Sequence, residues 1–288
     1  MTDKTRASAV AFYECEGGMK MTAGTVSSAS IIGMIFSCAV SIVLPVALAI
    51  IAAVRLKAKI LSFFIGALCF LLSAMVLESM LHRYVIAAVG SDFFADHIVL
   101  YALYGGLAAA VFEETGRFLM MKFLMKNRSS KENAVMFGIG HGGLEAMLIV
   151  GLTYVSNLMI ALVINEGKMD QLLSVIDVSQ RQETFDQLSV LWTTEAAEMY
   201  LPGIERISAI ALQICLSVIV YRAVSEKKWI YYLYAFLIHM FVDTGVVLMV
   251  NAVSPYIVEL ALFVETGVIA YFTFRMYKNM PKNEVENA

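Results

Sequence analysis

The sequence predicts an all-α polytopic membrane protein, a bundle of about seven transmembrane helices with a polar intramembrane cavity. Hydrophobic residues make up 60% of the chain and charged residues only 16%, and the mean hydropathy is +0.75, which is too apolar for a soluble globular domain. The apolar residues are gathered into long blocks, each close to or above the ~20 residues that cross a bilayer. Several blocks also contain carboxylates and histidines, which are costly in hydrocarbon unless they face the bundle interior.

Each predicted span is one apolar block, and the seven spans are residues 30–54, 60–80, 98–121, 134–164, 203–222, 229–250 and 256–275. The fourth block is longer than a bilayer requires, so we expect a tilted helix or one that continues beyond the membrane. The acidic loop 165–202 has apolar residues at helical spacing and predicts an external amphipathic segment on the membrane surface. The expected organisation is an N-terminal tail (1–29), one transmembrane domain (30–277) and a C-terminal tail (278–288).

Basic residues predict the orientation of these spans. They gather in alternate connections and in the C-terminal tail, at Arg55, Lys57, Lys59, Lys122, Lys126, Arg128, Lys131, Arg222, Lys227, Lys228, Arg275, Lys278 and Lys282. The opposite loops hold only Arg83, Lys168 and Arg181. By the positive-inside rule the N-terminus lies outside and the C-terminus is cytoplasmic.

Charged and histidine residues inside the spans are the candidates for function. They are Glu113, Glu114 and Arg117 in the third span, His141 and Glu145 in the fourth, Glu205 and Arg206 in the fifth, and His239 and Asp243 in the sixth. The seventh span holds Glu259 and Glu265, which lack partners in the sequence and are expected at loop ends or in packing. The first two spans hold nothing comparable, since Glu78 lies at the predicted end of the second. Arg117, near a basic helix end, could instead snorkel to the interface. Glu205 could be an interfacial charge or could extend an interior cavity.

Spacing predicts that three helices present polar stripes toward one another. Phe137, His141 and Glu145 step by four residues along one helix face, and His239 and Asp243 do the same on a second helix. On a third, Glu113 lies one turn from Arg117. Counted from the cytoplasmic ends, Glu113, His141 and His239 share a depth of roughly 12–15 Å at ~1.5 Å per residue, so we expect one pocket that opens toward the cytoplasm. Four glycines surround His141 and would let another helix or a bound peptide backbone approach: Gly138, Gly140, Gly142 and Gly143.

Three motifs in these spans carry a resemblance to a known group. Glu113-Glu114-x-x-Arg117, Phe137-x-x-x-His141 and His239-x-x-x-Asp243 are similar to the motifs EExxxR, FxxxH and HxxxN/D of the CAAX-processing and bacteriocin-processing (CPBP) intramembrane proteases. The string GHGGxE resembles the related bacterial YhfC family of intramembrane peptidases. The resemblance covers about half of the chain and implies a bacterial cytoplasmic membrane protein that hydrolyses peptide bonds.

The resemblance implies a water activated by a glutamate and assisted by histidines. A carboxylate in a low-dielectric pocket is a stronger base than an exposed one, which suits Glu113 or Glu114. His141 and His239 would orient the water and donate to the oxyanion, and Asp243 would fix a histidine tautomer or polarise the scissile carbonyl. Arg117, which would hold the second glutamate ionised, follows Glu114 by three positions rather than four. The choice of base therefore stays open.

The expected cofactor is none, and zinc is the alternative. His141, Glu145 and His239 would then be the ligands, although the pattern HxxxE lacks the HExxH signature of zinc proteases. The four cysteines show no metal or disulfide spacing. Two non-enzymatic alternatives are a proton-coupled transporter, because intramembrane acids and histidines form proton relays, and a scaffold. Expected partners are a peptide or membrane-protein substrate and the lipid bilayer, with no nucleic acid; the sequence does not indicate the oligomeric state.

Overall fold

The structure is a computed structural model that describes residues 11–14, 20–126 and 129–281. Residues 1–10 and 15–19 of the predicted N-terminal tail, Arg128 and residues 282–288 of the predicted C-terminal tail lie outside the described residues.

Seven helical spans in the described part of the chain are long and apolar enough to cross a membrane, which confirms the predicted fold class. They are α1 (Ser28–Arg55); α2 (Leu61–Phe70), η1 (Leu71–Glu78) and α3 (Ser79–Val89); α5 (Ile98–Ala109), η2 (Ala110–Glu114) and α6 (Thr115–Phe123); α7 (Lys131–Ala146), η4 (Met147–Gly151) and α8 (Leu152–Asn165); η6 (Glu198–Tyr200) and α11 (Leu201–Ser225); α12 (Trp229–Val250); and α13 (Pro255–Asn279). The short helix α4 (Ser91–Asp96) joins the second span to the third. The fourth span is the longest at 35 residues, as its apolar block predicts.

The second span continues well past its predicted end at residue 80, to Val89. Hydropathy falls around the predicted end because Glu78, His82 and Arg83 lie there, but these residues tolerate a helix, and Glu78 and His82 bond to each other within it. Glu78 therefore lies inside a helix, and the expectation that it marks a helix end was wrong.

Three of the spans contain a π-helical segment, η1, η2 and η4. A π-helical turn has i→i+5 hydrogen bonds and is wider than an α-helical turn, so successive side chains are separated by a smaller angle around the axis. In η2 this wider turn includes Glu113 and Glu114, and both side chains are buried. The local backbone thus directs two adjacent carboxylates into the bundle.

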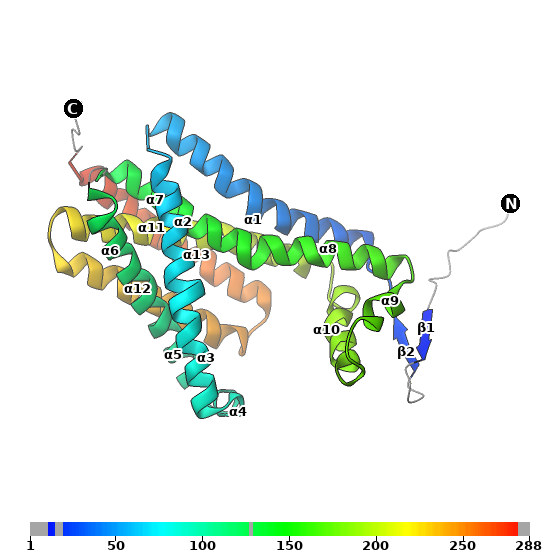
Figure 1. Ribbon diagram of the computed structural model, residues 1–288. Coiled ribbons are helices and arrows are strands. Elements are labelled where there is room, and N and C mark those ends of the chain that lie inside the picture. Colours follow the sequence, from blue (N-terminus) through cyan, green and yellow to red (C-terminus); the bar gives the residue numbers. More distant parts are fainter. Residues whose placement is uncertain (1–10, 15–19, 127–128, 282–288) are drawn as a thin grey trace.

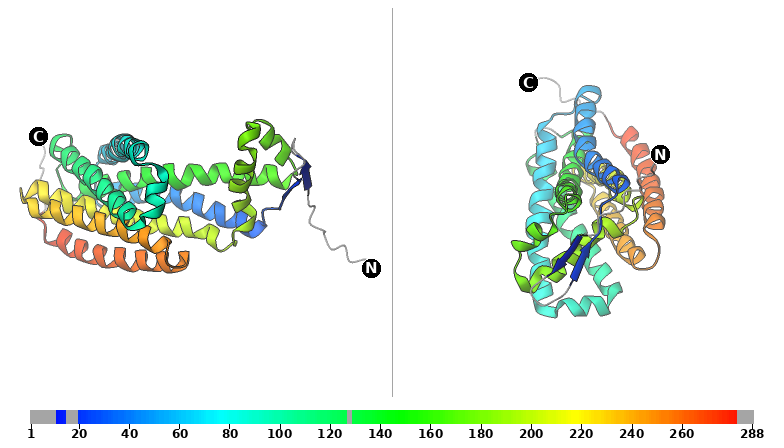
Figure 2. Two further views of the ribbon diagram at one scale, coloured as in Figure 1. Left: turned by 90° about the horizontal axis from the view of Figure 1, so that it is seen from below. Right: turned by 90° about the vertical axis from the view of Figure 1, so that its right-hand side faces the viewer.

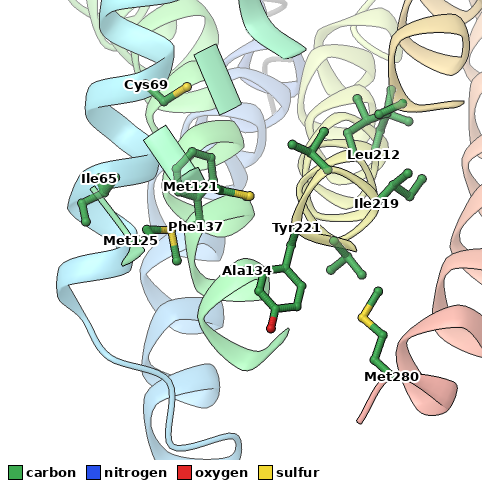
Figure 3. Packing of buried hydrophobic residues seen from close by; sticks show 14 of the residues in the cluster. Ile65, Cys69, Met121, Met125, Ala134, Phe137, Leu212, Ile219, Tyr221 and Met280 are labelled. Atoms are coloured by element: carbon green, nitrogen blue, oxygen red, sulfur yellow. The ribbon is translucent and has the colours of Figure 1, made fainter. Parts of the chain in front are cut away.

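Helix α7 lies at the centre of the bundle, where glycines allow close packing. A Cβ atom on Gly140 would collide with the carbonyl oxygen of Phe63 in α2, and one on Gly138 would lie 2.6 Å from the Cα of Ile214 in α11. Neighbouring helices therefore occupy the space beside these glycines, so of the two predicted uses, helix packing is the one found. Phe137 is buried in the adjoining apolar cluster with Met121, among other residues (Figure 3).

One end of the molecule is formed by an extension beyond the bundle. Helices α1 and α8 lead to it, and it contains α9 (Met169–Ser174), η5 (Val178–Gln180), α10 (Arg181–Thr193) and the antiparallel strands β1 (Ala11–Glu14) and β2 (Lys20–Ala23) (Figures 1 and 2). The C-terminal end of α13 lies at the opposite end of the molecule (Figure 2).

The 165–202 segment contains helices, as predicted, but several of its apolar side chains pack on protein. Met169 and Leu173 are buried in one cluster with Ala161 and Ile164 of α8, whereas Val175 is 82% exposed. The side chain of Asn165 holds the chain before α1 to this end, because it both accepts from and donates to the backbone of Val26, at 2.8 and 2.9 Å.

Candidate active site

The third and fourth spans meet in a buried carboxylate–imidazole pair. Oε2 of Glu113 lies 2.8 Å from Nε2 of His141, although 28 residues separate them in the sequence. Glu113 keeps 8% of its side chain exposed, and His141 is fully enclosed. The ring of Phe70 packs edge-on against the imidazole, with centroids 5.4 Å apart, and Phe137 lies at 6.4 Å on its own helix. The imidazole is thus held in place by aromatic packing as well as by Glu113.

Arg117 is the central cation of the site. Its guanidinium lies 3.0 Å from Oε2 of Glu113 and 3.3 Å from Oε1 of Glu114, and its side chain has no exposed surface. It also donates to the backbone carbonyl and the side-chain Oε1 of Gln213, and to Oγ of Ser217. A fully enclosed side chain cannot snorkel, so the interfacial interpretation of Arg117 is wrong.

A second carboxylate–imidazole pair joins the third and sixth spans. Oε1 of Glu114 lies 2.7 Å from Nδ1 of His239, and Nε2 of the same ring lies 3.4 Å from Oδ2 of Asp243. An ionised Glu114 requires a proton on Nδ1, so this contact fixes the tautomer and leaves Nε2 to face Asp243. Asp243 has 36% of its side chain exposed, which makes it the most accessible member of the predicted catalytic set.

Glu145 belongs to a further buried network, formed by the fourth and fifth spans. Its Oε1 accepts from Nη1 of Arg206 at 2.9 Å, and its Oε2 accepts from Nε2 of Gln213 at 2.7 Å. Arg206 also binds Glu205, with 2.6 Å between its Nε and Oε2 of the carboxylate. Because the other end of the Gln213 amide accepts from Arg117, this network is continuous with the central cation.

A cavity of about 320 Å³ lies against this polar cluster. Its lining includes His239, Asp243, Glu145, Glu205, Arg206, Gln213 and Glu78. Along α12 the lining runs from His239 to Val247, and along α11 it runs from Gln213 back to Glu205, so the cavity extends toward the end of the bundle that carries residues 165–202. The predicted orientation places that end outside, so it does not agree with the predicted opening of the pocket toward the cytoplasm. Of the motif residues, His239 and Asp243 line this cavity.

The side chains predicted as alternative zinc ligands are already paired with other groups, in an arrangement that does not fit a zinc site. Within residues 11–14, 20–126 and 129–281, no three His, Cys, Asp or Glu side chains are placed to hold a metal ion. His141 binds Glu113, and both oxygens of Glu145 accept from Arg206 and Gln213. Nη2 of Arg117 lies 3.0 Å from both Oε2 of Glu113 and Nε2 of His141, so a metal ion on those atoms would have to displace a fixed cation.

Three residues of the site were missed by sequence reasoning, namely Gln213, Ser217 and Glu78. Gln213 and Ser217 contact Arg117 from α11, and uncharged polar residues in a span give little signal in composition. Glu78 gave a signal, a carboxylate in an apolar block, but was placed at a helix end. Glu205 lines the cavity, which is the second of the two roles considered for it from the sequence.

Comparisons with known proteins agree with the predicted resemblance. A family model described as YhfC intramembrane metalloprotease matches residues 40–265. The membrane protein YhfC of Bacillus subtilis (strain 168) is 40% identical to this chain over 224 residues, which cover 77% of this chain and 86% of the relative. No solved structure matches the chain. The relation to the CPBP group is not part of these matches and rests on the three motifs.

Proposed function

The chain belongs to the YhfC intramembrane metalloprotease family, and from this premise we propose that it hydrolyses a peptide bond within or next to the membrane with water activated by Glu113. The observation that carries the proposal is the convergence of two carboxylate–imidazole pairs on one buried guanidinium, next to a cavity. We expect a peptide or a membrane-protein segment as the substrate.

Accessibility supports Glu113 as the base. A general base must come within hydrogen-bonding distance of the water whose proton it takes. Glu113 retains exposed surface, whereas Glu114 is completely enclosed and one of its oxygens is already bound to His239. Contacts from Arg117 and His141 hold Glu113 in one orientation, and their positive or donor character favours its ionised form before the reaction.

His239 is suited to stabilise the developing oxyanion. Glu114 fixes its ring through Nδ1, and Nε2 is the atom on the side of Asp243 and the cavity. In the proposed step, Glu113 takes a proton from water, the hydroxide adds to the scissile carbonyl carbon, and the carbonyl oxygen accepts a hydrogen bond from a protonated Nε2 of His239. Asp243 would favour that protonated ring.

The family description makes zinc the alternative cofactor. In the described part of the chain the donor atoms do not fit a metal ion as they are arranged, because Arg117 is placed between the two pairs that would have to supply the ligands. No step of the proposed reaction therefore passes through a metal, and chelation is the direct test of this point.

We propose that the N-terminus and the 165–202 segment lie outside and the C-terminus in the cytoplasm, as the basic connections indicate. In that orientation the cavity reaches from the buried pairs toward the external face. Water would then approach from that side.

The experiment is cleavage of a library of transmembrane peptides by the purified protein in detergent. Wild type is compared with Glu113→Gln, Glu114→Gln, His141→Ala and His239→Ala, each with and without a chelator, and Glu265→Gln serves as the control because Glu265 lies in a span outside this cluster. We expect cleavage that survives chelation, is lost in Glu113→Gln and is kept in Glu265→Gln. Loss on chelation with recovery on added Zn²⁺ would establish the zinc alternative, and a folded wild-type protein that cleaves nothing would favour a scaffold or transporter.

A further inference from the structure

Glu78 is one of four carboxylates that line the cavity, and the proposed function so far gives it no role. It lines the same space as His239, Asp243 and Glu145, but it comes from the second span, which carries none of the three motifs. Only 12% of its side chain is exposed. The burial of a carboxylate in hydrocarbon is costly, so a carboxylate inside a span usually has a polar partner or a functional role.

Glu78 begins a chain of three hydrogen-bonding side chains. Its Oε1 lies 3.1 Å from Nε2 of His82, and Nδ1 of His82 lies 2.8 Å from the hydroxyl of Tyr104 in α5. His82 is 35% exposed, and it lies about 10 Å along the helix from Val89, at ~1.5 Å per residue. The chain therefore leads from the cavity toward the end of the second span and joins it to the third.

The backbone at Glu78 has the same local form as the backbone at the catalytic glutamates. The π-helical segment η1 ends at Glu78, and η2 contains Glu113 and Glu114. Such segments are rare and occur frequently at functional sites, where the wider turn redirects side chains. Two of the π-helical segments therefore carry the carboxylates that reach this site.

Peptide hydrolysis also needs a proton donor for the leaving nitrogen. When the C–N bond breaks, the leaving nitrogen takes the electron pair and must receive a proton, while Glu113 holds the proton taken from water. Both oxygens of Glu145 accept from Arg206 and Gln213, and Glu205 is bound to Arg206. Of the two remaining lining carboxylates, Asp243 faces His239 of the catalytic set, whereas Glu78 bonds to His82, an imidazole outside that set.

We propose that Glu78 protonates the leaving amine and that His82 and Tyr104 resupply its proton. The proposal rests on the proposed peptidase function. In the step, Glu78 gives its carboxyl proton to the leaving nitrogen as the C–N bond breaks, which yields an amine and a carboxylic acid from the peptide and one water. The carboxylate of Glu78 then takes a proton through His82 from solvent, and Glu113 releases the proton of the attacking water, so the net reaction consumes only water.

An ester substrate separates this role from a structural one. An alcohol leaving group needs less protonation than an amine, so Glu78→Gln should lower kcat for the best-cleaved library peptide about 10²-fold, with KM within twofold, and should lower kcat much less for the same peptide with an ester at the scissile bond. Glu113→Gln should abolish both reactions. Equal losses of amide and ester cleavage in Glu78→Gln would overturn the proposal while leaving the peptidase function intact.

The relay residues have controls of the same residue type at the start of α5. His82→Asn and Tyr104→Phe should slow turnover several-fold, whereas His97→Asn and Tyr101→Phe should not, because His97 binds the Phe93 carbonyl and neither control residue is part of the chain from Glu78. If each relay variant behaves like its control, the relay is refuted.

A second measurement does not depend on cleavage. Dicyclohexylcarbodiimide reacts with a carboxyl group that holds a proton, and mass spectrometry of the labelled protein locates the adduct. We expect labelling of Glu78 in the wild type, slowed several-fold by His82→Asn and unchanged by His97→Asn. An unlabelled Glu78, or equal rates in the two histidine variants, would count against the proton relay even if no peptide is cleaved.

Discussion

Glu114 and His239 are joined by a contact of 2.7 Å between Oε1 and Nδ1, across 125 residues of sequence. The two adjacent glutamates therefore differ in their surroundings, since Glu114 holds an imidazole in complete enclosure while Glu113 keeps some exposure. Four of our predictions concern the buried polar residues and glycines around this contact, and a fifth concerns orientation in the membrane.

Replacing each glutamate by glutamine should separate the base from the orienting residue. We expect Glu113→Gln to lower kcat by about 10²–10⁴-fold, the usual contribution of a general base, with little change in KM. Glu114→Gln should keep measurable activity, because the amide oxygen can still accept from Nδ1 of His239. Steady-state kinetics of the two variants decides this, and a greater loss in Glu114→Gln would reverse the assignment.

Arg117 should be required for stability as well as for activity. Arg117→Met leaves two buried carboxylates without their cation, and breaking such a pair costs about 3–5 kcal/mol. We expect a clear fall in the thermal unfolding midpoint in detergent and partial recovery when Glu113→Gln is added, because that change removes one of the uncompensated charges. A double variant no more stable than Arg117→Met would show that the two residues are not energetically coupled.

Replacing the donor end of the Gln213 amide by an acceptor should be harmful. Its Oε1 accepts from Arg117 and its Nε2 donates to Glu145, so Gln213→Glu would place an acceptor against an acceptor. We expect Gln213→Glu to lower both the unfolding midpoint and kcat, with Gln187→Glu, on the exposed face of α10, as the control with neither effect. Wild-type behaviour of Gln213→Glu would mean that the two networks act independently.

Helix packing around His141 should be sensitive to a single methyl group. Gly140→Ala places a Cβ against the carbonyl oxygen of Phe63, and overpacking of this kind costs about 1–3 kcal/mol. Gly267→Ala, at a helical position with no atom near the new Cβ, should be neutral or slightly stabilising. Thermal unfolding of the two variants in the same detergent tests the difference, and equal midpoints would contradict the packing at Gly140.

The predicted orientation can be tested by labelling cysteines in intact cells. A membrane-impermeant maleimide should label Lys168→Cys, in the 165–202 segment, and should label Lys227→Cys only after the membrane is permeabilised. Both positions lie outside the spans. The opposite pattern would place the cavity on the cytoplasmic side.

The sequence by itself determined the membrane fold, the seven spans and the residues that form the two carboxylate–imidazole pairs. This was possible because long apolar blocks have one stable solution in a bilayer, and because a charged residue inside such a block must face a partner. The four-residue steps on α7 and α12 and the shared depth of Glu113, His141 and His239 then predicted their convergence, which the contacts confirm.

Only the tertiary structure decided which atoms meet. The partner of Glu145 is Arg206 rather than a metal, the amide of Gln213 links two networks, and Glu78 enters the cavity from a span that carries no motif. Helical spacing indicates the face on which a side chain lies, but rotation of one helix against another, and the added turn width of η1 and η2, are set by packing between spans. The direction of the cavity was decided in the same way, because it depends on where helices separate and not on the order of residues within any one of them.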